Sequence, residues 1–137
     1  MEKGFVPAES AEGWQLSTPS LILYASHKAS LEIFEEAGWD RIQRKRLLLT
    51  AYLWYLLDEL NFTHKIEFIT PREENARGCQ VSMLMLDKGK EVFNGLMSKG
   101  IFTDWREPNV IRLAPVPLYN TFTEVRYFVD SLSDLLA

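Results

Sequence analysis

Two helical patterns open the chain, each with apolar residues spaced three and four positions apart. We expect the first helix to begin at Thr18, because a threonine directly before a proline, here Pro19, is a typical helix cap. One face of this helix carries Tyr24, His27, Leu31 and Phe34. Gly38 is expected to stop the helix. The pattern therefore predicts a helix from Thr18 to about Ala37.

A second, longer helix is expected to follow almost at once. Asp40 is the expected cap, and the helix should continue to about Leu60. Its apolar stripe consists of Leu49, Leu53, Leu56 and Leu60. Because only a very short loop joins the two helices, we expect them to pack antiparallel.

The pattern then changes to shorter segments that are typical of strands. A short helix over 88–100 is expected between the second and third strands, and "REPN" (106–109) is expected to turn a hairpin. The predicted strands are 65–70, 79–86, 101–105 and 110–114.

A final helix is expected to begin with a capping box formed by Thr121 and Glu124. Its predicted buried residues are Val125, Phe128, Val129, Leu132 and Leu136. The element order is ααββαββα. We predict an α+β fold in which two long antiparallel helices precede a small, mostly antiparallel sheet that helices cover on one face. Residues 1–17 are expected to be an irregular lead-in, and 18–137 a single domain.

Composition and charge narrow the class of protein. A chain of 137 residues suits one domain with a real core. The net charge is −4 and the basic residues are scattered, which argues against nucleic acid as a partner. The longest apolar run, 47–57, is too short to span a bilayer, so no membrane is expected. With one cysteine, the chain can form no internal disulfide, and with two histidines beside it no zinc site is expected. The single cysteine suits a reducing compartment, so a cytoplasmic location is expected.

Catalytic residues are not evident in the chain. "DKGKE" (87–91) lacks the glycine spacing and the hydroxyl residue of a phosphate-binding loop. His27 is expected to be a buried, hydrogen-bonded histidine, and Cys79 a small core residue at the start of a strand. The chain alone is therefore expected to catalyse no reaction.

Arg112 stands in the middle of the predicted strand 110–114. Alternation places it on the face shared with Val110 and Ala114. One interpretation is a solvated arginine whose stem covers apolar neighbours. The other is a carboxylate-binding residue, because a guanidinium matches a carboxylate in two parallel hydrogen bonds and a strand fixes its base. Spacing alone leaves both open.

Four stretches of the chain together resemble one family. "DWREPNVIRLAPVPLYNTF" (104–122) closely resembles the end of the kynureninases. The other stretches, in the same order as in the family, are "WQLSTPS" (14–20), "ASLEIFEEAG…RIQRKRLLLTAYLWYLL" (29–57) and "ITPREENARGCQVS" (69–82). The similarity covers nearly the whole chain.

The resemblance implies the C-terminal small domain of an enzyme of the aspartate-aminotransferase fold type. Such an enzyme uses pyridoxal 5′-phosphate to cleave L-kynurenine, or 3-hydroxykynurenine, to anthranilate and L-alanine in tryptophan breakdown toward NAD. The cofactor lysine, the phosphate-binding residues and the aspartate under the pyridine nitrogen would lie in a large domain upstream. This chain is thus expected to supply no catalytic, cofactor-binding or metal-binding residue, to bind no cofactor alone, and to belong to a homodimer.

By the same resemblance, three residues of the chain bind substrate. Arg112 would pair with the α-carboxylate, while Ser17 and Thr18 would flank the aromatic end. Capping of a helix is the alternative role for Thr18, and both roles can hold. Ser20 stands where many relatives have a second proline, which leaves the preference for the 3-hydroxylated substrate open.

Two other functions remain open from the sequence. The chain would then be either an autonomous amino-acid-binding or dimerisation module, or the small domain of another pyridoxal-phosphate enzyme such as an aminotransferase or a desulfurase. The dense match of "RLAPVPLYNTF" (112–122) favours kynureninase over the second of these.

Overall fold

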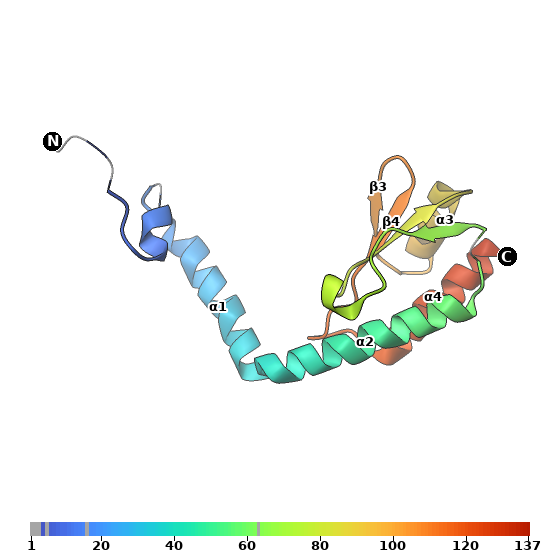
Figure 1. Ribbon diagram of the computed structural model, residues 1–137, viewed down its shortest axis with the longest axis horizontal. Helices are drawn as coiled ribbons and strands as arrows, with labels where there is room; N and C mark the ends of the chain where they lie inside the picture. Colours follow the sequence, from blue (N-terminus) through green and yellow to red (C-terminus); the bar gives the residue numbers. More distant parts are fainter. Residues whose placement is uncertain (1–3, 5, 16, 63) are drawn as a thin grey trace. The chain divides into compact units, whose positions relative to one another are not determined.

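The computed structural model describes residues 4, 6–15, 17–62 and 64–137 (Figure 1). The chain divides into two compact units, Met1–Gly38 and Trp39–Ala137. Within the described residues, no helix is both long enough and apolar enough to cross a membrane.

In its described residues, the first unit contains a 3-10 turn, η1 (Ala11–Trp14), and the helix α1 (Leu21–Ala37). The expected start at Thr18 is wrong, because Ser20 is the N-cap residue and its carbonyl accepts the first helical hydrogen bond, from the Tyr24 N–H at 3.1 Å. Serine is as good a cap as threonine, so the "TPS" sequence contains two alternative starts. The predicted end is correct: α1 stops at Ala37, and Gly38 has a φ of 79°, a conformation that suits glycine.

No residue of α1 is buried. The predicted apolar face is exposed, including Leu31 at 54%. His27 is exposed as well, so the expectation of a buried histidine is wrong. Exposed apolar faces of this kind are typical of surfaces that pack against another protein segment.

The second unit begins with α2 (Trp39–Glu59). Asp40 lies in the first turn of this helix and is not its cap, because Gly38 ends α1 and helical geometry resumes directly at Trp39. An aspartate in the first turn still interacts favourably with the helix dipole. Since α1 and α2 belong to different units, their antiparallel packing stays a prediction.

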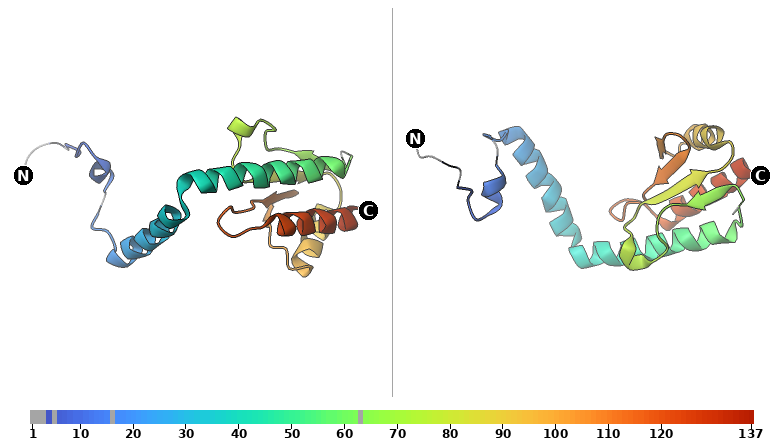
Figure 2. Two further views of the ribbon diagram at one scale, coloured as in Figure 1. Left: turned by 90° about the horizontal axis from the view of Figure 1, so that it is seen from below. Right: turned by 45° about the horizontal axis from the view of Figure 1, so that its top comes forward.

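An antiparallel sheet of four strands follows, in the order β1-β2-β4-β3. The remaining elements are β1 (Ile66–Phe68), η2 (Glu74–Ala76), β2 (Val81–Met85), α3 (Gly89–Ser98), β3 (Asp104–Arg106), β4 (Val110–Leu113) and α4 (Phe122–Leu136). Helices α2 and α4 run side by side (Figure 2). The predicted order of helices and strands and the α+β class are confirmed.

Alternation along the strands separates an apolar face from a polar face. Met83 on β2 lies opposite Ile111 on β4, and both are fully buried. They join a core to which the helices contribute Leu49, Leu53, Leu57, Val92, Leu96, Val125, Phe128, Val129, Leu132 and Leu136. The five residues predicted to be buried in α4 are all in this core. Arg112, next to Ile111, therefore points to the opposite face of the sheet.

The predicted capping box of α4 is present. The Thr121 hydroxyl accepts from the Glu124 N–H at 3.2 Å, and the Glu124 carboxylate accepts from the Thr121 N–H at 2.7 Å. The backbone N–H of Thr121 is the main cause that holds the pKa of Glu124 below its ordinary value. This box fixes the start of α4 directly after the segment that leaves β4.

Thr121→Ala is expected to lower the free energy of unfolding by about 1 kcal/mol, because α4 loses the hydroxyl that accepts from its first turn. Urea unfolding followed by circular dichroism measures the change. Thr123→Ala is the matched control, since Thr123 is exposed in the same turn and does not form the box. An equal loss in both variants would contradict the assigned cap.

Candidate functional site

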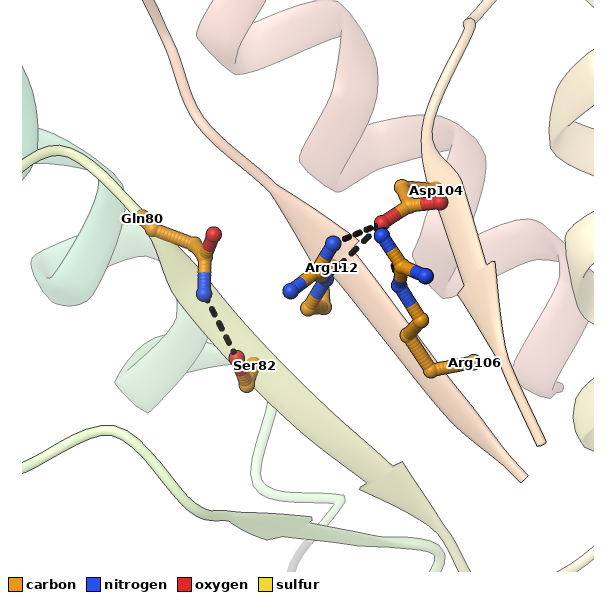
Figure 3. A network of polar contacts seen from close by, with 5 residues as sticks. All are labelled: Gln80, Ser82, Asp104, Arg106 and Arg112. Carbon is orange, nitrogen blue, oxygen red and sulfur yellow. Dashed lines mark hydrogen bonds and ion pairs between the residues drawn. The ribbon is translucent and has the colours of Figure 1, made fainter. Parts of the chain in front are cut away.

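Arg112 lies at the centre of the polar face of the sheet (Figure 3). Its neighbours in register are Ser82 on β2 and Asp104 on β3. The Arg112 side chain is 31% exposed, so part of the guanidinium remains accessible. The sheet thus fixes the base of this arginine on both sides and leaves its head at the surface.

Asp104 is the direct partner of Arg112. The Arg112 Nε–H donates to Asp104 Oδ2 at 2.8 Å, and Nη2 donates to the same oxygen. Arg106 also donates from Nε to that oxygen, at 2.9 Å. The hydrogen bond from Arg112 is the largest cause that lowers the pKa of the Asp104 carboxyl, so Asp104 is an anion at neutral pH.

On the other flank of Arg112, Gln80 and Ser82 form a small polar pair. Gln80 Nε2 donates to Ser82 Oγ at 3.2 Å, and the Ser82 N–H donates to Thr70 Oγ1 at 2.9 Å. Ser82 is buried, with 8% exposure. Figure 3 shows both side chains on the same face as the guanidinium. This flank presents neutral groups, so the negative charge next to Arg112 comes from Asp104.

The segment that leaves β4 contains Pro115 and Pro117, each of which fixes its own φ, and it is also closed by hydrogen bonds. Pro115 is buried, and the next N–H, of Val116, donates to Asn120 Oδ1 at 2.8 Å. The Asn120 N–H in turn donates to the Val116 carbonyl at 2.8 Å. Asn120 thereby closes a loop that joins β4 to the capping box of α4. An asparagine directly before a helix cap is a typical turn signal, so the sequence itself indicates this role for Asn120.

Ser17 and Thr18, the other two predicted substrate-binding residues, belong to the first unit. Both are exposed, and the carbonyl of Ser17 accepts a hydrogen bond from Gln15 Nε2 at 3.1 Å. The structure does not place them relative to Arg112, which lies in the second unit. Their role stays a prediction.

Arg72 and Arg77, in the segment 69–82, both pack on the ring of Trp54. The Arg77 guanidinium carbon lies 5.0 Å from the centre of the Trp54 ring, which also receives Arg72 at 4.2 Å. These cation–π contacts cover an indole that is itself buried.

Contrary to the prediction, Cys79 does not lie in a core strand. It precedes β2 and is only half-buried. This partial burial still raises the pKa of its thiol.

The polar face carries a cation that matches a carboxylate. None of the four strands carries a lysine. No group of residues suited to a metal ion occurs in the part of the chain that the structure describes. What the face offers is the partly exposed side chain of Arg112, whose base is fixed by the strands on both sides. Its chemical capacity is recognition of an acid group.

Comparisons with known proteins identify the family. Residues 42–132, which include the whole sheet, match the family described as "Kynureninase C-terminal domain". The kynureninase of Flavobacterium psychrophilum is 44% identical over 130 residues, which is 93% of this chain and 31% of that protein. The kynureninase of Koribacter versatilis is 43% identical over 126 residues, which is 92% of this chain and 30% of that protein. The chain therefore spans about a third of the length of these curated relatives.

A solved structure supports the fold independently. It is a mutant of C-DES with glycine covalently linked to its pyridoxal-phosphate cofactor. The TM-score is 0.71 at 17% identity, over 93% of this chain and 32% of that one. At that identity the likeness establishes the fold, which agrees with the predicted small domain of a pyridoxal-phosphate enzyme. Together with the family match, which covers more than half of the residues, it confirms the resemblance: the chain belongs to the kynureninase family, as its C-terminal domain.

Proposed function

We propose that this chain is the substrate-binding domain of a pyridoxal-phosphate-dependent hydrolase that cleaves L-kynurenine or 3-hydroxykynurenine. The products are L-alanine and anthranilate or its 3-hydroxy form. The observation that carries the proposal is the family match over 42–132, which contains Arg112 and both of its neighbouring strands. The partly exposed Arg112 side chain on the polar face supports it, because the substrate is an amino acid with a free carboxylate.

Arg112 binds the α-carboxylate of the substrate in this proposal. A guanidinium that donates to both carboxylate oxygens restricts the rotation of the carboxylate, and with it the orientation of the bound amino acid. The orientation of the Cα bonds relative to the cofactor ring decides which bond breaks. Pyridoxal phosphate, when bound, supplies the electron sink for that cleavage. Arg112 therefore contributes orientation to the reaction, and the cofactor supplies the chemistry.

The rest of the active site comes from a large domain in this proposal. The exposed apolar face of α1 supports such a partner, because isolated surfaces rarely leave so many apolar side chains in water. Residues 18–137 then act as one domain, and residues 1–17 lead in from the large domain. Ser17 and Thr18 line the aromatic end of the substrate. The enzyme is a cytoplasmic homodimer in the family pattern.

The chain alone is expected to form no cofactor complex. After incubation with pyridoxal phosphate and dialysis, it should retain no cofactor absorbance band, because the strands around Arg112 present no lysine. A full-length kynureninase treated in parallel should retain the band. Saturable binding of pyridoxal phosphate at one lysine of the chain would contradict the proposal that the large domain alone binds the cofactor.

A further inference from the structure

Asp104 uses only one edge of the Arg112 guanidinium. A guanidinium carries five N–H groups in one plane, one on Nε and two on each terminal nitrogen. Nε and Nη2 both donate to Asp104 Oδ2, so Asp104 occupies the side edge that these two nitrogens form. The register of β3 and β4 sets this choice, because Asp104 and Arg112 are direct cross-strand partners. The backbone of the hairpin thus places Asp104 beside Arg112.

The second edge of the guanidinium is left for a ligand. It is formed by Nη1 and the remaining N–H of Nη2. Among the residues that the structure describes, no acceptor for Nη1 is found. Two parallel N–H groups on one edge are what a carboxylate binds in the bidentate arrangement. An arginine held by one edge can therefore bind a substrate carboxylate by the other without losing its first partner.

We infer that Asp104 is the positioning residue of the carboxylate-binding arginine: it holds the side edge of Arg112 so that the end edge faces the substrate. The inference rests on the proposed function of Arg112 and adds the device that orients it. A long arginine side chain has several rotatable bonds, and its free head samples many orientations. A fixed carboxylate beside it removes that freedom before the substrate arrives, which is how a preorganised site gains affinity.

A merely structural role for Asp104 is the weaker interpretation. The Asp104 side chain is 47% exposed and the pair lies at the surface, where an ion pair contributes little to stability. Asp104 also accepts from Arg106, whose side chain is 59% exposed and more open than that of Arg112. Asp104 therefore pairs with the less exposed arginine, Arg112, through two nitrogens and with Arg106 through one. Loss of Asp104 should disturb binding much more than folding.

Two substitutions at Asp104 in the full-length enzyme test the inference. Asp104→Ala is expected to lower kcat/KM for kynurenine by about 10- to 100-fold, because a small misplacement of a binding group has effects of that size. Asp104→Asn keeps an oxygen that accepts from Arg112 and is expected to recover most of the loss. Asp134→Ala is the matched control, since Asp134 is an exposed aspartate of α4 that pairs with Lys99 at the end of α3. It should stay close to wild type.

An NMR measurement on the 137-residue chain gives a second readout that does not depend on turnover. The Arg112 Nε–H signal should be resolved and slow to exchange in the wild type, and should join those of the free arginines in Asp104→Ala. The inference is overturned if Asp104→Ala leaves either this signal or kcat/KM unchanged, or if Asp104→Asn is as impaired as Asp104→Ala. In those cases a large loss in Arg112→Ala would still support the proposed function, so the two failures are distinguishable.

Discussion

Arg112→Ala in the full-length enzyme is expected to lower kcat/KM for kynurenine by about 30-fold to several thousand-fold. The range corresponds to about 2–5 kcal/mol, the usual effect of truncating one partner of a hydrogen-bonded charge pair at a binding site. The reason is specific to the geometry of the polar face. Arg112 is the cation whose base the sheet fixes from both sides, between Ser82 and Asp104. Without it, the substrate carboxylate has no fixed partner from this domain.

Three comparisons separate a loss of carboxylate recognition from a general loss of structure. Arg112→Lys keeps the charge but not the planar fork, so an intermediate loss is expected. The carboxamide of kynurenine, which lacks the negative charge, should bind to Arg112→Ala and to wild type with similar affinity. Arg126→Ala removes an exposed arginine of α4 that pairs with Asp130 one turn further along the helix, and should stay close to wild type.

The cofactor itself provides the internal control. Because the strands around Arg112 carry no lysine, Arg112→Ala should retain the cofactor absorbance of the wild-type enzyme. If kynurenine turnover were unaffected by this substitution, the assignment of Arg112 to the α-carboxylate would be wrong. If the cofactor were lost together with turnover, the defect would lie in assembly of the enzyme and not in recognition of the acid group.

The elements of the fold were predictable because their periodicity is strong. The stripe of α2 and the buried face of α4 repeat at three and four residues, and Leu49, Leu53 and Val125 are all buried. Helix starts were less predictable. Thr18 and Ser20 are both good caps two residues apart, and local chemistry does not choose between them. Asp40 suits the cap and the first turn of a helix equally well. It lies in the first turn because α2 begins at Trp39, directly after Gly38 ends α1.

The partner of Arg112 was missed for a definite reason. The hairpin turn was predicted over "REPN" (106–109), which would pair residue 105 with 110 and place Thr103 opposite Arg112. In the structure Arg106 pairs with Val110, so the turn is one residue shorter and Asp104 takes that position. Asn109 contributes to this register by exchanging two hydrogen bonds with Met85 on β2, each 2.9 Å long. A difference of one residue in a loop thus decided which side chain holds the arginine.

Ser17 and Thr18 illustrate what a single domain leaves undetermined. They lie in the unit that precedes Trp39, and α1 buries none of its side chains. The assignment of Ser17 and Thr18 to the aromatic end of the substrate therefore rests on the family resemblance, whereas the position of Arg112 is set by strand pairing within the second unit.

Ile111→Ala is expected to lower the free energy of unfolding of the chain by about 2–5 kcal/mol. Ile111 is fully buried between Met83 on β2 and Trp105 on β3, and truncation leaves a cavity in the core beneath the polar face. For a domain whose total stability is about 5–15 kcal/mol, the loss is a large fraction. Thermal unfolding followed by circular dichroism should show a midpoint lower by roughly 8 °C or more.

The matched control is Ile69→Ala, which truncates the same residue type just after β1, where the side chain is 55% exposed. It should change the free energy of unfolding by less than about 0.5 kcal/mol. The comparison also tests the site, because side chains alternate along a strand and a shift of one residue would exchange the faces of Ile111 and Arg112. Equal effects of the two substitutions would mean that Ile111 is not the buried member of the pair. Arg112 would then lie in the core, where it could not meet a substrate.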